Sequence, residues 1–168
     1  GEYLHLLQHL RATLMYMLPD MYQALAAHPD FAAAEFGTVR WAICGGAPCP
    51  PGLSQAYAAR GICLKQGYGT TEAGANCFAI GDGEARRHPD SVGRPMPHMA
   101  AAIRRPDGSL CEDNELGELG LSGEAICSGY LNSAEGWRLA YRDGWFWTGD
   151  LALRDAEGRY YIRGRRQE

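Results

Sequence analysis

The chain has 168 residues, of which 46% are hydrophobic and 21% are charged, and its formal net charge is -4. This composition is typical of a soluble globular protein, so a packed core is expected and disorder is not. The sequence has no long basic run, which argues against nucleic acid as the main partner, and no apolar run long enough to span a membrane, which argues against an integral membrane segment. Because the start does not resemble a signal peptide, we expect a cytoplasmic protein, and we expect its cysteines to be buried free thiols.

The first eighty or so residues alternate between strand and helix patterns. Short apolar strands are predicted at 12–17, 39–46 and 62–69, with helices from Pro19 onward and at 50–60, the second closed by Gly61. Strands that alternate with helices predict a parallel sheet, in which ligands bind at the carboxyl ends of the strands. Both glycine-rich segments, CGGAPCP and GYGTTEAG, follow predicted strands and therefore fall at those ends.

From about residue 87 the pattern changes to short strands separated by turn signals. Strands are predicted within 98–105, 117–123, 125–131, 145–155 and 159–164, which indicates a small antiparallel sheet or barrel. The predicted fold class is therefore α/β, with a parallel-sheet portion followed by a small antiparallel β-sheet or barrel subdomain. We expect one domain over residues 1–88 and a second, mainly β, over 89–168.

The segment KQGYGTTEAG combines a flexible turn with several groups that suit a nucleotide. Glycines on both sides of Tyr68 allow close approach to a ligand, and its ring can stack on a base. The hydroxyls of Thr70 and Thr71 can bind phosphate oxygens, and the Glu72 carboxylate can hold Mg²⁺. Taken alone, the segment is equally consistent with a strand-to-helix turn in which a threonine is the N-cap.

Three further segments allow the same two interpretations. The glycines of CGGAPCP can lie against a flat ligand or form a tight turn. Asp150, which follows a strongly apolar strand, can accept hydrogen bonds from a vicinal diol or form an Asx-turn. The arginines at 163, 165 and 166 can contact a ribose or phosphate near Asp150, or form a solvated basic edge.

The order and spacing of these segments are more specific than any one of them. GGAPCPPGL, KQGYGTTEAG, SVGRPMP, GELGLSGEAICSGYLN, DGWFWTGDLA and GRYYIRGRRQE follow one another along the chain. The chain thereby resembles, over essentially all its residues, the AMP-forming adenylating enzymes: the acyl-CoA synthetases, the luciferases and the adenylation domains of peptide synthetases. By position, the resemblance implies nucleotide contacts at Gly45, Gly46, Ala47, Gln66, Gly67, Tyr68, Gly69, Thr71, Asp150 and Arg165.

The resemblance also implies individual roles. Tyr68 would pack on adenine, Thr71 would bind the phosphate, and Glu72 would bind Mg²⁺, so that Thr71 and Glu72 are the expected catalytic residues. Asp150 would bind both ribose hydroxyls, and Arg165 would contact the ribose as well. The segment at 45–47 would lie between the adenine and the acyl pocket.

The reaction implied by the resemblance begins when a carboxylic acid attacks the α-phosphate of ATP, which forms an acyl-adenylate and releases pyrophosphate. The acyl group then passes to a thiol, usually that of coenzyme A. The family's phosphate loop and its C-terminal catalytic lysine do not occur in these residues, and Gln167 stands where the family has an Asp or Lys hinge. We therefore expect a piece of the large N-terminal domain that ends at the hinge and is inactive by itself.

Two alternatives to an acyl-CoA synthetase remain open. One is a peptide-synthetase adenylation domain that loads a carrier protein, and the other is a non-catalytic nucleotide-binding module. Residues 65–78 contain no obvious polar anchor for an α-amino group, which favours a fatty or aryl acid and a role in fatty acid metabolism. The identity of the acid and the oligomeric state are left open.

Overall fold

The computed structural model describes residues 1–50 and 52–166, so the predicted hinge residue Gln167 lies outside the described residues. The chain divides into two compact units, one comprising Gly1–Gly67 with Ile80–Asp90 and the other Tyr68–Ala79 with Ser91–Glu168. The sequence places a single domain boundary between residues 88 and 89, and that division stays a prediction.

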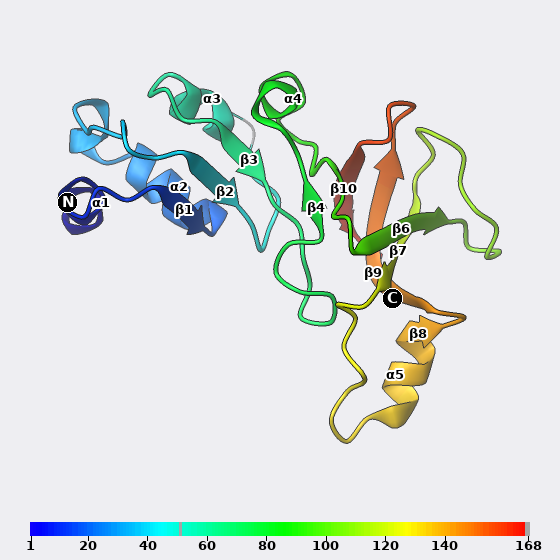
Figure 1. Ribbon diagram of the computed structural model, residues 1–168. Helices are drawn as coiled ribbons and strands as arrows, with labels where there is room; N and C mark the ends of the chain where they lie inside the picture. Colours follow the sequence, from blue (N-terminus) through cyan, green and yellow to red (C-terminus); the bar gives the residue numbers. More distant parts are fainter. Residues whose placement is uncertain (51, 167–168) are drawn as a thin grey trace. The chain divides into compact units, whose positions relative to one another are not determined.

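The first unit is built on a parallel sheet, as predicted. Its strands are β1 (Leu14–Met17), β2 (Trp41–Cys44) and β3 (Leu64–Gln66), in the order β1-β2-β3 (Figure 1). The helices of this unit are α1 (Glu2–His9), α2 (Pro19–Ala26), α3 (Leu53–Ala58), α4 (Asp82–Arg87) and the 3-10 helix η1 (Pro29–Ala32). Pro19 begins α2 because proline lacks an N–H that the first helical turn would leave unpaired.

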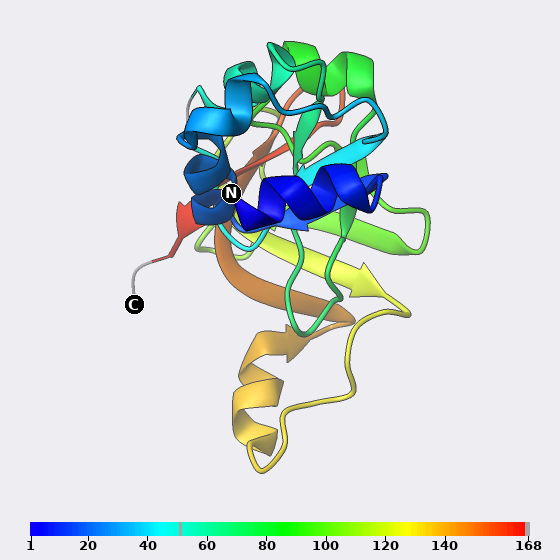
Figure 2. The same ribbon diagram turned by 90° about the vertical axis from the view of Figure 1, so that its left-hand side faces the viewer.

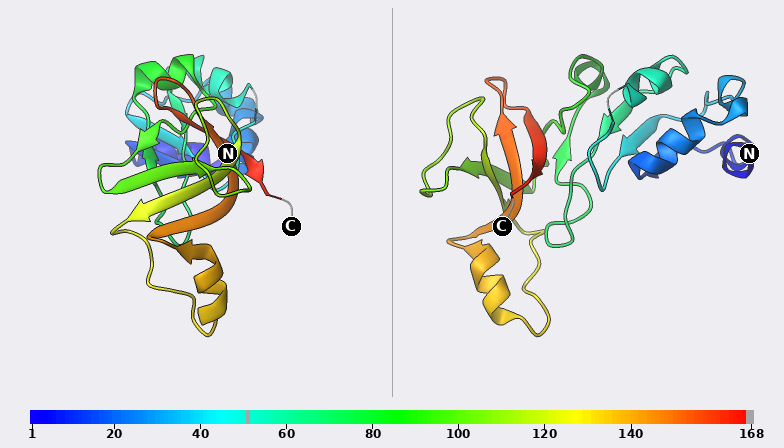
Figure 3. Two further views of the ribbon diagram at one scale, coloured as in Figure 1. Left: turned by 90° about the vertical axis from the view of Figure 1, so that its right-hand side faces the viewer. Right: turned by 180° about the vertical axis from the view of Figure 1, so that it is seen from behind.

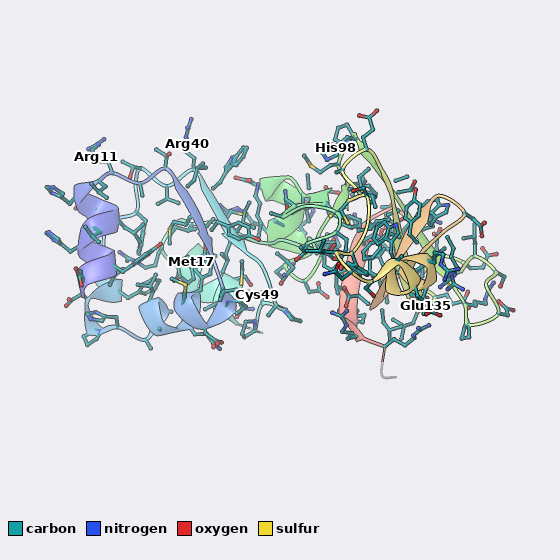
Figure 4. All side chains as sticks on the ribbon, turned by 90° about the horizontal axis from the view of Figure 1, so that it is seen from below. Arg11, Met17, Arg40, Cys49, His98 and Glu135 are labelled. Atoms are coloured by element: carbon teal, nitrogen blue, oxygen red, sulfur yellow. The ribbon has the colours of Figure 1, made fainter. Side chains whose placement is uncertain are left out.

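One face of this sheet forms the core of the unit. Side chains alternate across a strand, so β1 buries Met15 and Met17 and exposes Leu14 and Tyr16. Tyr22 of α2 and Tyr57 of α3 are fully buried against this face and pack edge to face at 5.1 Å. The Tyr22 hydroxyl donates to the carbonyl oxygen of Met15 at 3.1 Å, so this buried polar group is satisfied. Figure 4 shows Met17 and Cys49 on the helix-covered side and Arg40 on the opposite side.

The second unit is built on an antiparallel sheet, which confirms the predicted fold class. Its strand order is β10-β9-β7-β6, and β8 pairs with β9. Figure 2 shows β7 (yellow) beside β9 (orange), and a separate two-stranded ladder joins β4 to β5. The strands are β4 (Phe78–Ala79), β5 (Arg94–Pro95), β6 (Met99–Arg104), β7 (Gly117–Gly123), β8 (Tyr141–Arg142), β9 (Trp145–Arg154) and β10 (Tyr160–Arg165).

The strand predicted at 125–131 is wrong. Turns, bends and irregular backbone make up that segment, and a helix, α5 (Ala134–Ala140), follows it. The helix has a physical basis in its composition, because Ala, Glu, Arg and Leu favour a helix interior; Ser133 occupies the N-cap position without a capping hydrogen bond from its side chain. The ring of Trp137 holds α5 on the sheet by stacking on Phe146 at 5.9 Å.

Two expectations from composition can be compared with the structure. Among the described helices, none has the length and hydrophobicity needed to cross a membrane. All six cysteines fall in the described part of the chain and are free, as expected. Only Cys44 and Cys77 are buried, however, so the expectation that all are buried is wrong for the other four.

Candidate functional site

In the first unit, two loops leave neighbouring strand ends. Cys44, the last residue of β2, is paired with Gln66, the last residue of β3. The N–H of Gly67 donates to the Cys44 carbonyl oxygen at 2.8 Å, which extends the parallel ladder by one bond. The candidate segment 45–47 therefore begins directly beside Gln66 and Gly67, as expected for a site at the carboxyl ends of strands.

The Gln66 side chain holds the loop that follows β2. Its Oε1 accepts a hydrogen bond from the Cys49 N–H at 2.7 Å, and its Nε2 donates to the Gly67 carbonyl oxygen at 2.9 Å. The same Nε2 lies 3.3 Å from the carbonyl oxygens of Cys44 and Ala47. Two N–H groups thus have three backbone acceptors, so the amide is committed to the loop. The adenylate contact expected of Gln66 stays a prediction.

The glycine at position 45 is explained by a close contact. A Cβ atom there would lie 2.5 Å from the Tyr16 hydroxyl oxygen, a distance that real Cβ atoms do not show. Any larger residue would have to displace the Tyr16 ring or the loop. This part of the loop therefore presents backbone without a side chain, which is the property expected of a segment that lies against a flat ligand.

Cys44 and Cys49 flank this loop, and their thiols interact. The contact with Cys49, together with burial, raises the pKa of Cys44 above its ordinary value. The same contact lowers the pKa of Cys49. Cys49 is therefore the more readily ionised thiol of the pair.

In the second unit, residues 68–77 form a compact loop that closes on itself rather than starting a helix (Figures 1 and 3). The Thr70 N–H donates to the Gly74 carbonyl oxygen at 3.1 Å, and the Cys77 N–H donates to that of Tyr68 at 2.8 Å. The Thr70 hydroxyl accepts from the Ala73 N–H at 3.2 Å, in the manner of a cap, although no helix follows. A Cβ atom on Gly69 would overlap the backbone of residues 74 and 75, so the loop requires glycine there.

Tyr68 and Asp150, which are 82 positions apart, are joined by a hydrogen bond. The Tyr68 hydroxyl donates to Asp150 Oδ2 at 2.6 Å. The Asp150 N–H in turn donates to the Thr148 hydroxyl at 3.0 Å, and this hydroxyl donates to the Leu119 carbonyl oxygen at 3.0 Å. Burial, and then the bond to Asp150, raise the pKa of Tyr68 well above its ordinary value, so the phenol remains a donor.

Arg165 completes this group of residues. It is the direct partner of Asp150 in the ladder between β9 and β10, and its Nη1 lies 3.9 Å from Asp150 Oδ1. The Arg165 side chain is 77% exposed, whereas that of Asp150 is 16% exposed. Tyr68, Asp150 and Arg165 thus lie together in one unit, with a hydrogen bond between Tyr68 and Asp150 that the sequence did not predict.

Glu72 also has a partner that the sequence did not predict. Its Oε1 accepts a hydrogen bond from the Tyr130 hydroxyl at 2.6 Å, and its carbonyl oxygen accepts from the Cys127 N–H at 2.7 Å. Burial, and then the bond to Glu72, raise the pKa of Tyr130 to about 12. The two side chains are 58 positions apart, and no spacing pattern connects them. Thr71, the neighbour of Glu72, is exposed.

Comparison with known proteins identifies the family. The family model described as "AMP-binding enzyme" matches residues 1–131. The chain belongs to the AMP-binding enzymes. It is 35% identical over 162 residues to feruloyl-CoA synthase of an Amycolatopsis species, covering 96% of this chain and 33% of that protein. It is 34% identical over 148 residues to the long-chain-fatty-acid–CoA ligase FadD13 of Mycobacterium tuberculosis, covering 88% of this chain and 29% of that protein.

Solved structures of adenylating enzymes have the same fold as this AMP-binding chain. The inhibitor-bound N-terminal domain of FACL13 from Mycobacterium tuberculosis matches 98% of this chain and 41% of that chain, with a TM-score of 0.87 and 32% identity. The AMP complex of the O-succinylbenzoate coenzyme A synthetase of Bacillus subtilis matches 98% of this chain and 34% of that chain, with a TM-score of 0.85 and 27% identity. The chain spans about a third of the length of the curated relatives it matches.

The residues around Glu72 fit one mode of magnesium binding. Within residues 1–50 and 52–166, no group of three or more His, Cys, Asp or Glu side chains is arranged to hold a metal ion. Mg²⁺ is commonly bound by one or two carboxylates together with waters and substrate phosphates, so it does not need such a group. Glu72 Oε1 accepts the hydrogen bond from Tyr130, whereas Oε2 has no hydrogen-bond partner among the described residues and is the freer oxygen for a cation.

Proposed function

We propose that the whole protein containing this chain is an AMP-forming acyl-CoA synthetase. It would join a carboxylic acid to AMP and then transfer the acyl group to the thiol of coenzyme A. The observation that carries this proposal is the hydrogen bond between Tyr68 and Asp150 with Arg165 opposite, because these are three residues that the resemblance assigns to one adenosine. Relatives named as CoA ligases for feruloyl, indoleacetate and long-chain fatty acyl groups support the reaction class.

The chemistry of Asp150 suits a ribose. A carboxylate has about four acceptor positions, and only one of them is used by Tyr68. Each oxygen therefore retains capacity to accept a hydrogen bond from one of two vicinal hydroxyls. Arg165 would place a positive charge beside the carboxylate and offers its own donors to the sugar.

The phosphates would be held by the 68–77 loop. Thr71 would donate its exposed hydroxyl to a phosphate oxygen, and Glu72 would hold Mg²⁺, which neutralises phosphate charge when it is bound. As an oxygen of the acid forms a bond to the α-phosphorus, the bond from that phosphorus to pyrophosphate breaks. The contribution of these residues is to position the reactants and to stabilise the charge that moves to the leaving group.

The proposed substrate is a fatty or aryl acid and the proposed acceptor is coenzyme A. Residues 65–78 offer no evident anchor for an α-amino group, and the relatives named above act on acids of these kinds. A cytoplasmic location and a role in fatty acid metabolism are part of the proposal and rest on the sequence alone.

The test uses the whole protein with ATP, Mg²⁺ and a panel of fatty, aryl and amino acids. Acid-dependent exchange of pyrophosphate into ATP reports adenylation, and mass spectrometry of the products with coenzyme A, a carrier protein or an amine identifies the acceptor. We expect exchange with a fatty or aryl acid and a coenzyme A thioester. A product only with the carrier protein or the amine would overturn the acceptor, and AMP binding without exchange for any acid would indicate a nucleotide-binding module.

A further inference from the structure

Tyr130 lies in the segment that follows β7, and this segment makes two hydrogen bonds to Glu72 of the 68–77 loop. The Tyr130 hydroxyl donates to Glu72 Oε1 at 2.6 Å, and three residues earlier the Cys127 N–H donates to the Glu72 carbonyl oxygen at 2.7 Å. Residue 72 is therefore held at its main chain and at its side chain by one short segment. Figures 1 and 3 show this segment (yellow) beside the loop (green).

Aromatic packing fixes the Tyr130 ring from the other side. The ring packs edge to face on Trp137 of α5, with ring centroids 5.3 Å apart. Trp137 stacks in turn on Tyr141 at 5.1 Å and on Phe146 at 5.9 Å. Phe146 is only 3% exposed and belongs to the core strand β9, so the chain of rings connects Tyr130 to the sheet.

The hydrogen bond to Glu72 is of the strong kind. It joins a phenol to a carboxylate at 2.6 Å, and hydrogen bonds of the charge-assisted class are about twice as strong as those between neutral groups. A bond to one oxygen restricts rotation of the carboxylate and leaves the second oxygen available. Carboxylates that ligate metals are generally oriented by hydrogen bonds of this kind from residues that do not touch the metal.

We propose that Tyr130 is a positioning residue for Glu72: it holds Oε1 so that Oε2 is presented to a divalent cation that accompanies a nucleoside triphosphate. This inference rests on the proposed function, in which Glu72 is the cation ligand. Tyr130 acts through Glu72 and contacts neither the nucleotide nor the cation. The aromatic chain through Trp137 gives α5 a role in the site, because it carries the ring on which Tyr130 packs.

The chain contains a matched control. Tyr141 stacks on the same Trp137, and within the described residues its hydroxyl has no hydrogen-bond partner. Tyr141→Phe therefore removes a hydroxyl from the same aromatic cluster without touching Glu72. Tyr130→Phe removes the hydroxyl that bonds Glu72 and keeps the ring, so the comparison isolates the hydrogen bond.

The experiment measures Mn²⁺ binding by electron paramagnetic resonance, in the whole protein saturated with a non-hydrolysable ATP analogue. We expect Tyr130→Phe to weaken Mn²⁺ binding by about 10-fold, the lower end of the range for residues that orient metal ligands. Tyr141→Phe should bind as the wild type does. In a Glu72→Gln background, Tyr130→Phe should have no further effect, because the tyrosine acts through the carboxylate.

The outcomes separate this inference from the proposed function. Mn²⁺ binding at wild-type affinity in Glu72→Gln would overturn the role of Glu72 as a cation ligand and with it the role of Tyr130, whereas the acyl-CoA synthetase reaction is tested separately by pyrophosphate exchange. Binding that depends on Glu72 but is unchanged, within about twofold, in Tyr130→Phe would overturn the role of Tyr130 alone. If Tyr130→Phe unfolds, Trp137→Leu, which removes the ring support and keeps the hydroxyl, is measured instead: a weaker affinity supports the positioning role and an unchanged one overturns it.

Discussion

Removal of the Tyr68 hydroxyl is the perturbation whose effect follows most directly from the geometry. Tyr68→Phe keeps the ring, which packs edge to face on Phe78 with centroids 5.9 Å apart, and deletes the 2.6 Å bond to Asp150. The Asp150 side chain is 16% exposed, so water replaces the lost partner only in part. Hydrogen bonds to charged groups contribute about 1.5–3 kcal/mol, and we expect the free energy of unfolding to fall by that amount.

The assay is urea denaturation of the whole protein and of Tyr68→Phe, Asp150→Ala and the double variant. A direct bond predicts a coupling energy of about 1.5–3 kcal/mol between the two positions. Effects that add within about 0.5 kcal/mol would show that the bond does not contribute, and the reasoning would be refuted.

AMP affinity distinguishes a site residue from a structural one. Tyr161 donates a comparable hydrogen bond to Asp155 Oδ2 at 3.0 Å in the same unit, and neither residue is assigned to the nucleotide. Tyr161→Phe is therefore the matched control. Tyr68→Phe should weaken AMP binding by about 3- to 10-fold, equivalent to roughly 1 kcal/mol, and Tyr161→Phe should not. Equal losses in the two variants would contradict a role for Tyr68 in the site.

Two substitutions and one chemical modification test the loops that follow β2 and β3. Gly69→Ala forces a methyl group into backbone, so we expect a loss of about 1–3 kcal/mol in thermal or urea unfolding, and a wild-type midpoint would contradict the loop geometry. Gln66→Glu replaces the side-chain N–H donors by a carboxylate oxygen that faces three carbonyl oxygens. The free energy of unfolding should therefore fall by about 2 kcal/mol or more. A variant as stable as the wild type would refute the role of the Gln66 amide in holding the loop after β2. Near pH 7, iodoacetamide should modify Cys49 before Cys44, because Cys49 has the lower pKa of the two thiols. Peptide mass spectrometry measures the order of modification, and faster modification of Cys44 would contradict the lowered pKa of Cys49.

The elements that the sequence predicted are those with a local signal. Strands β1 and β2 are short apolar runs, β2 and β3 are each followed by a glycine, and α2 begins at a proline. Helix α5 was missed because it has only seven residues, includes Gly136, and depends on the packing of Trp137 against Phe146, which the sequence does not show.

Hydrogen bonds between side chains that are far apart in the sequence could not be predicted in this way. Tyr68 and Asp150 were each chosen for their chemistry, but nothing in the sequence shows that one donates a hydrogen bond to the other across 82 positions. Tyr130 lies within the segment GELGLSGEAICSGYLN, but its role is not predictable from the sequence, since its hydrogen bond to Glu72 exists only in the folded chain. Likewise, a glutamine expected to contact a nucleotide proves to have its amide bonded to the adjacent loop.

Acid-dependent exchange of labelled pyrophosphate into ATP by the whole protein, compared between wild type and Asp150→Ala, tests the central claim most directly. The account predicts exchange with a fatty or aryl acid in the wild type. Because Asp150 would bind both ribose hydroxyls, it also predicts that Asp150→Ala, shown to be folded, raises the ATP concentration needed for half-maximal exchange by about 10-fold or more. Exchange in Asp150→Ala at wild-type ATP concentrations, or no exchange in the wild type with any acid, would contradict it.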